Sequence, residues 1–210
     1  MTDLHNQRRE YLQASLRRND LSSDPFDQFN DWFNTTLKDE GQIDATCMQL
    51  ATVSSEGQPH SRIVLLKELR KDGFVFFTSY QSQKGHDIAD NPKVGLSFAW
   101  NRQERQIHIE GIARKISTGD SDQYFQSRPL DSQRAACLAT QSSVIDSKEQ
   151  LMTAFEALQA QDVIERPEDW GGYVVEPTRF EFWQGGPARI HDRFVYEPMK
   201  DGWEIKRLAP

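Results

Sequence analysis

The sequence has few of the features that mark secreted, metal-binding or membrane-spanning proteins. Its 210 residues include only two cysteines, Cys47 and Cys137, which lie far apart and form no Cys-x-x-Cys motif. This spacing argues against a disulfide framework or a cysteine zinc site and favours a reducing compartment. No apolar run is long enough to span a membrane, and the polar stretch 1–10 has no secretory signal. We therefore expect a cytoplasmic protein without a metal site.

Common catalytic motifs are also missing. The sequence has no glycine-rich phosphate loop, no Gly-x-Ser-x-Gly and no His-Glu-x-x-His. Carboxylates are plentiful, but none pair convincingly within a motif. The net charge of −7 disfavours nucleic acid as a partner, so a chain of this charge that binds anions must concentrate its cations locally.

The residues that are present predict one globular domain over 1–210, with no internal repeat or linker. Hydrophobic periodicity predicts helices over 4–18, 26–37, 84–89, 119–127, 132–140 and 147–159. Alternation of period two predicts strands over 47–54, 59–69, 73–80, 93–100, 105–117, 172–176, 179–183, 189–196 and 203–208. Because no long helix separates the first strands, we expect a mainly antiparallel sheet and a barrel.

The most informative stretch is 180–193, which reads Phe-Glu-Phe-Trp-Gln-Gly-Gly-Pro-Ala-Arg-Ile-His-Asp-Arg. Its alternating residues are interrupted by a turn at 184–187, so it predicts a hairpin. On the second strand Arg189, His191 and Arg193 would share one face. Guanidinium groups bind oxyanions, and an imidazole can donate, accept or shuttle a proton. The residues alone leave two interpretations open: a binding face for an anionic aromatic ligand, or an ordinary hairpin whose polar face meets water.

Two cations bracket four aliphatic residues in the predicted strand 59–69. Arg62 and Lys67 are separated by an odd number of positions, so a regular strand would point them to opposite faces and let them serve two anions. A buried strand with charged ends is the alternative. Further along, the stretch 78–84 combines hydroxyls, a lysine and a helix N-terminus, which together suit a phosphate group.

A second possible phosphate site follows at 124–132. Tyr124 and Arg128 are one helical turn apart, and Ser132 stands at the start of the next predicted helix. With Lys67 these residues would form a site for a phosphate monoester. Ser132 can also be a plain helix cap, and capping and binding can coexist.

The motifs at 62–67, 124–132 and 180–193 resemble those of the pyridoxine (pyridoxamine) 5'-phosphate oxidase family, and the resemblance extends over nearly the whole chain. It implies an FMN-binding split β-barrel with peripheral helices, present as a homodimer with FMN at the subunit interface. The implied reaction oxidises pyridoxamine or pyridoxine 5'-phosphate to pyridoxal 5'-phosphate and reduces O2 to H2O2. Helices would be peripheral to a mainly antiparallel sheet.

The resemblance also implies roles for individual residues. Arg189 and His191 would be catalytic and clamp the pyridine ring over the flavin. The substrate phosphate would be held by Lys67, Tyr124, Arg128 and Ser132, and Arg8 and Tyr11 would lie in a mobile N-terminal lid within 1–20. The cofactor would contact Arg62, Ile63, Val64, Leu65, Leu66, Lys67, Phe77, Thr78, Gln83, Lys84, Gln106, Gln141, Ser142, Trp183 and Arg193.

One position departs from the family pattern. Gln83 stands where the family usually has arginine, and an amide can donate hydrogen bonds but has no charge. Our hypothesis is that FMN still binds through Arg62, Lys84 and Ser142. Two alternative functions remain open. The chain could be a non-catalytic carrier of FMN or pyridoxal phosphate, or another split-barrel enzyme such as a flavin reductase.

Overall fold

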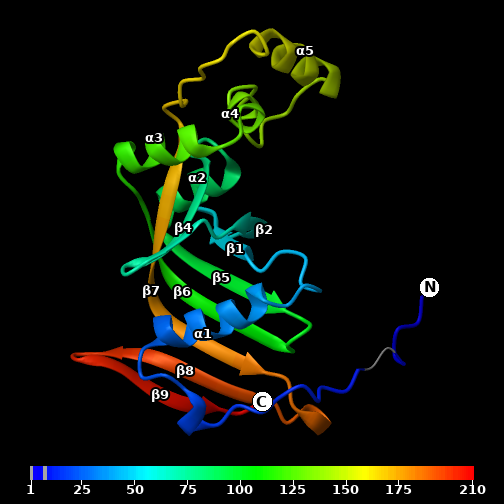
Figure 1. The fold of residues 1–210 in the computed structure, drawn as a ribbon, viewed down its shortest axis with the longest axis vertical. Helices are drawn as coiled ribbons and strands as arrows, with labels where there is room; N and C mark the ends of the chain where they lie inside the picture. The colour runs from blue at the N-terminus through cyan, green and yellow to red at the C-terminus, as the bar shows by residue number, and fades with distance from the viewer. Residues whose placement is uncertain (1, 7–8) are drawn as a thin grey trace. The chain divides into compact units, whose positions relative to one another are not determined.

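A mostly antiparallel sheet organises the chain (Figure 1). The computed structural model describes residues 2–6 and 9–210. Within these residues the strands pair in the order β2-β1-β5-β6-β7-β4-β3, with β8 on β7 and β9 on β8. The sheet confirms the predicted mainly β, antiparallel architecture. Its strands are β1 (Cys47–Val53), β2 (Pro59–Leu65), β3 (Glu68–Arg70), β4 (Gly73–Ser79), β5 (Lys93–Trp100), β6 (Arg105–Lys115), β7 (Trp170–Gln184), β8 (Asp192–Met199) and β9 (Gly202–Leu208).

The chain divides into two compact units. The first comprises residues 1–49, 95–110 and 177–210, and the second comprises residues 50–94 and 111–176. The chain passes from one unit to the other inside strands β1, β5, β6 and β7.

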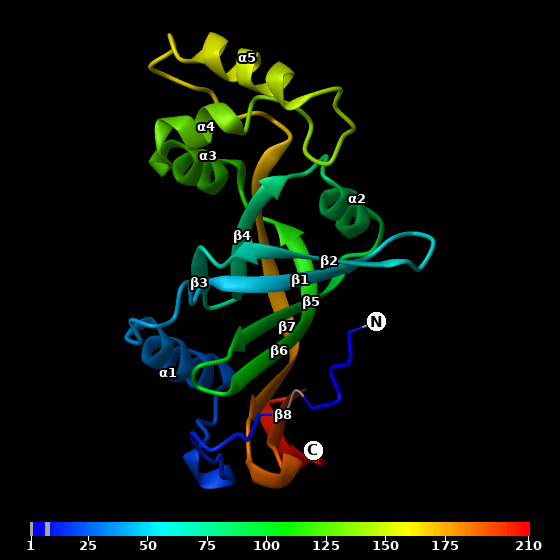
Figure 2. The ribbon, with the colours of Figure 1, turned by 90° about the vertical axis from the view of Figure 1, so that its right-hand side faces the viewer.

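The second unit contains β2, β3, β4 and four helices. These are α2 (Gln83–Asp90), α3 (Thr118–Ser127), α4 (Leu130–Ala135) and α5 (Lys148–Leu158), and the last three gather beyond the end of β4 (Figures 1 and 2). β4 pairs with the first part of β7, which places Phe77 opposite Gly172 and Ser79 opposite Trp170. Phe125 of α3 forms a small buried core with Ile164 and Trp170.

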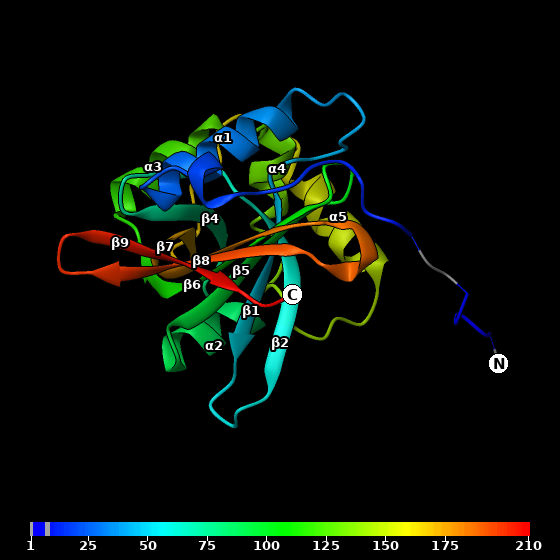
Figure 3. The same cartoon turned by 90° about the horizontal axis from the view of Figure 1, so that it is seen from below.

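The first unit is built on aromatic packing. Helix α1 (Pro25–Leu37) buries Phe29 against Phe98 and Trp100, with ring centroids 5.1 and 5.9 Å away. The end of β7 pairs with β8, and β8 continues into β9 as the hairpin seen in Figure 3. No helix of the described residues is long and apolar enough to cross a membrane.

The predicted helix over 4–18 is wrong. The described residues of this range form no α-helix, and only the short 3-10 helix η1 (Arg18–Asp20) follows. The backbone N–H groups of Gln13 and Leu16 donate instead to the carboxylates of Glu104 and Asp192, both at 2.9 Å. Partners distant in sequence therefore replace the carbonyls that a helix would use, and local periodicity does not reveal such partners.

Three other boundaries differ from the prediction. The strand predicted over 59–69 is interrupted after Leu65, so it becomes β2 and β3. The strands predicted over 172–176 and 179–183 are joined in β7, which runs through Pro177 because proline can adopt an extended backbone. The helix predicted over 132–140 is the shorter α4, which starts directly after Pro129 and is followed by tight turns. Apart from the strand predicted over 189–196, which is β8 (Asp192–Met199), the remaining elements agree closely with the prediction.

Removing the cap of α1 should lower stability. The Asp24 carboxylate accepts a hydrogen bond from the N–H of Phe26 at 2.7 Å, as the Asp24-Pro25 pair predicts. We expect Asp24→Ala to cost about 1 kcal/mol of the free energy of unfolding and to lower Tm by about 2 to 4 °C. Asp24→Ser, which keeps a capping oxygen, is the control in thermal unfolding. Equal Tm values for the two variants would contradict a capping role.

Candidate functional site

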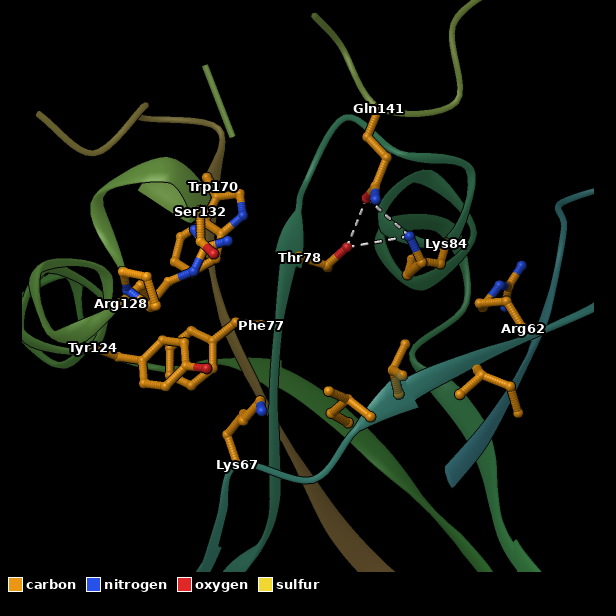
Figure 4. Close-up of a pocket in the computed structure, with 14 residues that line it drawn as sticks. Arg62, Lys67, Phe77, Thr78, Lys84, Tyr124, Arg128, Ser132, Gln141 and Trp170 are labelled. Atoms are coloured by element: carbon orange, nitrogen blue, oxygen red, sulfur yellow. Dashed lines mark hydrogen bonds between the residues drawn. The ribbon is translucent and has the colours of Figure 1, made fainter. Parts of the chain in front are cut away.

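A cavity of about 620 Å³ in the second unit brings together most of the predicted phosphate-binding residues (Figure 4). Of the residues predicted to bind cofactor or substrate, its wall includes Arg62, Ile63, Val64, Leu65, Lys67, Phe77, Thr78, Lys84, Tyr124, Arg128, Ser132 and Gln141. The predicted contacts Leu66 and Gln83 do not line it, and Ser142 lines a neighbouring cavity of about 380 Å³ that also includes Arg128 and Gln141.

Lys84 is a buried cation on one side of this cavity. Its side chain comes from the first turn of α2, and only 7% of the residue is exposed. The ammonium donates to Thr78 Oγ1 at 3.1 Å, Gln141 Oε1 at 3.0 Å and Ser82 Oγ at 3.2 Å. All three acceptors are neutral. Burial, together with the nearby charge of Arg62, lowers the pKa of Lys84 to about 8.

Arg62 lies on the same side of the cavity, on β2. Its Nη1 donates to Thr52 Oγ1 at 2.7 Å, and its Nη2 is 3.8 Å from the carboxylate of Asp87. Burial lowers the pKa of Arg62, and the Asp87 charge opposes this shift. Gln83 is exposed, and its amide donates to Asp87 Oδ1 at 3.0 Å. The side chain of Gln83 therefore contacts the carboxylate behind Arg62.

Aromatic rings and a guanidinium form the opposite side of the cavity. The Tyr124 ring stacks on Phe77 with centroids 3.7 Å apart, and the Arg128 guanidinium lies 4.6 Å from the centroid of Trp170. Burial lowers the pKa of Arg128 and raises the pKa of Tyr124. The Nη1 atom of Arg128 is buried without a hydrogen-bond partner among the residues that the structure describes. A buried donor of this kind is costly unless a ligand supplies the acceptor.

The cations of the cavity form two groups on opposite sides of β4 (Figure 4). Arg62 and Lys84 lie on one side, and Lys67 and Arg128 lie on the other, with Tyr124. The parity argument for Arg62 and Lys67 was wrong in its premise, because β2 ends at Leu65 and a regular strand does not extend to Lys67. Both residues nevertheless line one cavity. Ser132 also lines it, as the third residue of α4 rather than the cap.

The predicted ring-clamp residues belong to the first unit. Arg189 is not on a strand, since it ends the 3-10 helix η2 (Pro187–Arg189), and both it and Ala188 have positive φ, of 61° and 52°. The prediction that 189–196 forms one strand was therefore wrong. His191 precedes β8, packs on Trp183 with ring centroids 4.6 Å apart, and accepts a hydrogen bond at Nδ1 from the N–H of Gly186 at 3.2 Å.

Tyr11 covers the His191–Trp183 pair. Its ring lies edge-on to His191 and to Trp183, at 5.4 and 5.6 Å between centroids. A Cβ atom at Gly185 would lie 2.7 Å from the Tyr11 ring, so glycine permits this packing. Tyr11 and Arg189 also line a cavity of about 510 Å³. Arg8, the other predicted lid residue, lies outside the described residues.

Two further predicted flavin contacts have protein partners in the first unit. Arg193 forms an ion pair with Glu181, with Nε 2.8 Å from Oε1, and donates from Nη1 to the carbonyl of Ala209. Gln106 Oε1 lies 3.3 Å from Nε2 of His108.

Sequence reasoning missed several residues of the site. Trp170 lines the cavity beneath Arg128, and its only signal was an aromatic residue directly before a Gly-Gly pair. Thr52, His60 and Asp87 also escaped notice, because they come from three separate elements and share no motif.

Comparisons with known proteins place the chain in a family. Residues 38–162 match the family described as pyridoxamine 5'-phosphate oxidase, and residues 170–210 match the pyridoxine 5'-phosphate oxidase C-terminal dimerisation region. The chain is 51% identical to a pyridoxine/pyridoxamine 5'-phosphate oxidase of Teredinibacter turnerae, over 99% of this chain and 100% of the relative. It is 49% identical to pyridoxine/pyridoxamine 5'-phosphate oxidase 1 of Hydrogenovibrio crunogenus, over 99% of this chain and 98% of the relative.

Solved structures give the same fold. PhzG from Burkholderia lata, in complex with tetrahydrophenazine-1-carboxylic acid, superposes with a TM-score of 0.87 at 26% identity, over 93% of this chain and 98% of that chain. An FMN-binding protein of Nostoc punctiforme related to pyridoxamine 5'-phosphate oxidase has a TM-score of 0.72 at 21% identity, over 90% and 100% of the two chains. The fold and these neighbours therefore define an FMN-binding split barrel. Within that class, the chain belongs to the pyridoxamine 5'-phosphate oxidase family, as the sequence motifs predicted.

The lowered pKa of Lys84 predicts a pH-dependent affinity for FMN. Lys84 is charged below pH 8 and loses its proton as the pH rises through about 8, so the attraction for a phosphate group is lost at high pH. Between pH 7 and 9 we expect the Kd for FMN to rise by about tenfold, measured by quenching of flavin fluorescence. Lys84→Met should bind weakly at both pH values. An equal pH dependence in Lys84→Met would assign the titration to another group.

Proposed function

We propose that this chain is an FMN-dependent oxidase that converts pyridoxamine 5'-phosphate or pyridoxine 5'-phosphate to pyridoxal 5'-phosphate. The names of relatives at 51% and 49% identity over almost the full chain support this activity. The structural observation that carries it is one cavity with two separate groups of cations, on opposite sides of β4. The reaction requires two phosphate-bearing molecules, a cofactor and a substrate, in contact with each other.

FMN is the cofactor, and the side of the cavity with Arg62 and Lys84 suits its phosphate. The ammonium of Lys84 has only neutral hydrogen-bond partners among the described residues, so a dianionic phosphate would supply the missing negative charge. The backbone and side chains of Ile63, Val64, Leu65, Leu66, Phe77, Thr78, Gln141 and Ser142 are the further contacts we propose. When bound, FMN would supply the redox chemistry, which is the two-electron oxidation of the substrate at C4' with O2 as the electron acceptor and H2O2 as the second product.

The opposite side of the cavity suits the substrate phosphate. Arg128 offers an unpaired Nη1 donor, and Lys67, Tyr124 and Ser132 line the same cavity with an ammonium and two hydroxyls. The rings of Phe77 and Trp170 lie 5.6 Å apart between centroids, and an apolar wall of this kind beside these groups would strengthen their interaction with an anion. These residues bind and orient the substrate.

We assign the pyridine ring of the substrate to Arg189 and His191. Since the N–H of Gly186 donates to Nδ1 of His191, the neutral imidazole carries its proton on Nε2, from which it can donate to a ring substituent. Trp183, Arg193 and Gln106 are proposed flavin contacts. Arg8 and Tyr11 are proposed lid residues. Catalysis by this set is mainly orientation of the substrate against the cofactor.

The protein acts as a homodimer, because residues 170–210 match the dimerisation region of the family. We propose that FMN lies at the subunit interface and that residues 1–210 act as one split-barrel domain, with residues 1–20 as its lid segment. A cytoplasmic location is also a proposal, and the two free cysteines, Cys47 and Cys137, support it.

An anaerobic absorbance spectrum tests the proposed function. Addition of pyridoxamine 5'-phosphate to the FMN-loaded protein should bleach the flavin band, and air should restore it with formation of H2O2. A flavin band that does not bleach with this substrate would contradict the oxidase and favour a carrier. Bleaching by NAD(P)H alone would instead favour a flavin reductase.

Replacing Arg128 should remove recognition of the substrate phosphate. We expect Arg128→Met to raise KM for pyridoxamine 5'-phosphate by about 10- to 100-fold, because a hydrogen bond to a charged group is lost. Activity with pyridoxamine, which lacks the phosphate, should change little. Arg114→Met removes an exposed ion pair with Glu176 and is the control for loss of an arginine. An equal loss with both substrates would contradict phosphate recognition by Arg128.

Replacing Arg189 should affect the chemical step more than cofactor binding. We expect Arg189→Ala to slow flavin reduction by about tenfold or more, because orientation of the substrate ring is lost, while the Kd for FMN stays nearly constant. Stopped-flow reduction under anaerobic conditions and a fluorescence titration measure the two quantities. Lys200→Ala, at the exposed turn between β8 and β9, is the control. A variant that loses FMN but reduces bound flavin at the normal rate would contradict this role.

A further inference from the structure

A buried carboxylate lies behind the Arg62 side of the cavity. Asp87 is on α2, one turn beyond Gln83, and only 2% of the residue is exposed. It does not line the cavity. An acidic residue beside a phosphate-binding group weakens anion binding by simple electrostatics, so its presence here requires another explanation.

Asp87 accepts hydrogen bonds from three directions. Its Oδ2 receives the hydroxyl of Thr52 at 2.6 Å and lies 2.9 Å from Nδ1 of His60, and its Oδ1 receives the amide of Gln83 at 3.0 Å. Burial alone would raise the pKa of the Asp87 carboxyl, but these hydrogen bonds outweigh burial and hold the pKa below its ordinary value. Asp87 is therefore a charged carboxylate fixed in one orientation.

The carboxylate is linked to Arg62 through Thr52. The Thr52 hydroxyl donates its only proton to Asp87, so its oxygen is free to accept from Nη1 of Arg62, which lies 2.7 Å away. Nη2 of Arg62 lies 3.8 Å from Asp87 Oδ2. The same guanidinium also points Nη1 at the carbonyls of Leu50 and His60, both at 3.3 Å. These contacts hold the edge of the Arg62 guanidinium that carries Nη1 in one orientation.

We propose that Asp87, acting through Thr52, is a positioning residue that holds the Arg62 guanidinium for the 5'-phosphate of FMN. The proposal rests on the proposed function, since Arg62 is assigned there to the cofactor phosphate. His60 and Gln83 complete the coordination of the carboxylate from β2 and from the first turn of α2. The loss of direct attraction between Asp87 and the phosphate is outweighed by a guanidinium that is already oriented before binding.

The network also explains how a neutral residue is accommodated at position 83. Gln83 and Asp87 are four residues apart on α2, the spacing at which helical side chains meet. An arginine at position 83 would bring a second guanidinium to the carboxylate that orients Arg62. Glutamine satisfies Oδ1 of Asp87 without competing for its charge.

The sign of one measurement separates positioning from simple electrostatics. Asp87→Asn removes a negative charge near the phosphate site, so electrostatics alone would strengthen FMN binding. Positioning predicts that the Kd for FMN rises by about tenfold. The Kd for riboflavin, which lacks the phosphate, should stay constant. Both are measured by fluorescence quenching, and Asp90→Asn, an exposed carboxylate on the same helix, is the control.

A matched pair at Thr52 protects the test against misfolding of Asp87→Asn. Thr52→Ser keeps the hydroxyl that links Asp87 to Arg62, whereas Thr52→Val keeps the volume and removes the hydroxyl. We expect the Kd for FMN to rise in Thr52→Val by about tenfold and to stay near the wild-type value in Thr52→Ser. A general structural role would instead lower thermal stability and weaken FMN and riboflavin equally.

The outcomes distinguish the two proposals. Unchanged or tighter FMN binding by Asp87→Asn and Thr52→Val, with a wild-type protein that binds FMN, would overturn the positioning role and leave the proposed function standing. Equal weakening toward FMN and riboflavin would also overturn it. A wild-type protein that binds neither flavin would overturn the proposed function and the positioning role together.

Discussion

Most of the positively charged side chains that line the cavity are partly or wholly buried, although the net charge of the chain is −7. Lys84 is almost fully buried among neutral oxygens, and Arg128 has a buried Nη1 atom without a partner among the described residues. Desolvation of such groups is unfavourable, and the lowered pKa values of both side chains express that cost. A phosphate group would relieve it at each position. On the proposed function, the incompletely compensated charge of these side chains would favour the binding of an anion.

Three cationic side chains of the cavity, Arg62, Lys84 and Arg128, are held in place by different kinds of contact. Arg62 has a carboxylate and a hydroxyl behind it, Lys84 has neutral oxygens, and Arg128 lies on the face of Trp170. Aromatic support keeps the guanidinium in place without neutralising it, since the ring offers a cation–π contact but no countercharge. A carboxylate gives firmer orientation and reduces the net charge. The proposed cofactor side and the proposed substrate side of the cavity thus hold their cations by different contacts, a carboxylate and hydroxyl on one side and an aromatic ring on the other.

Much of the fold followed from local sequence because strands, caps and turns are encoded locally. Asp24 with Pro25 marked the start of α1, and period-two alternation marked β4 and β5 almost to the residue. The N-terminal segment could not be predicted in this way, because its backbone donates to the distant carboxylates of Glu104 and Asp192. Local periodicity describes the side chains of a segment and carries no information about such partners.

The residues of the site likewise fall into those that local sequence motifs could predict and those that they could not. Lys67, Tyr124, Arg128 and Ser132 could be predicted because they lie in motifs that resemble a known family, and the structure places all four around one cavity. The Thr52–His60–Asp87 group could not be predicted, because two short contacts among residues from three separate elements leave no pattern in a single sequence. The alternating pattern wrongly predicted Arg189 on a strand. Ala188 and Arg189 adopt a left-handed backbone, and neither residue type indicates such a conformation.

That left-handed turn has a consequence for how the protein can change. Each non-glycine residue with positive φ costs roughly 1 to 3 kcal/mol unless its surroundings compensate. Two such residues stand in succession at Ala188 and Arg189, and only Ile190 separates them from His191. Glycine at position 188 would relax the backbone, yet it would also widen the range of directions open to the neighbouring guanidinium. At this turn, a change that raises the free energy of unfolding would loosen the orientation of the Arg189 guanidinium. Selection for higher thermal stability is therefore expected to reduce the accuracy with which that side chain is placed.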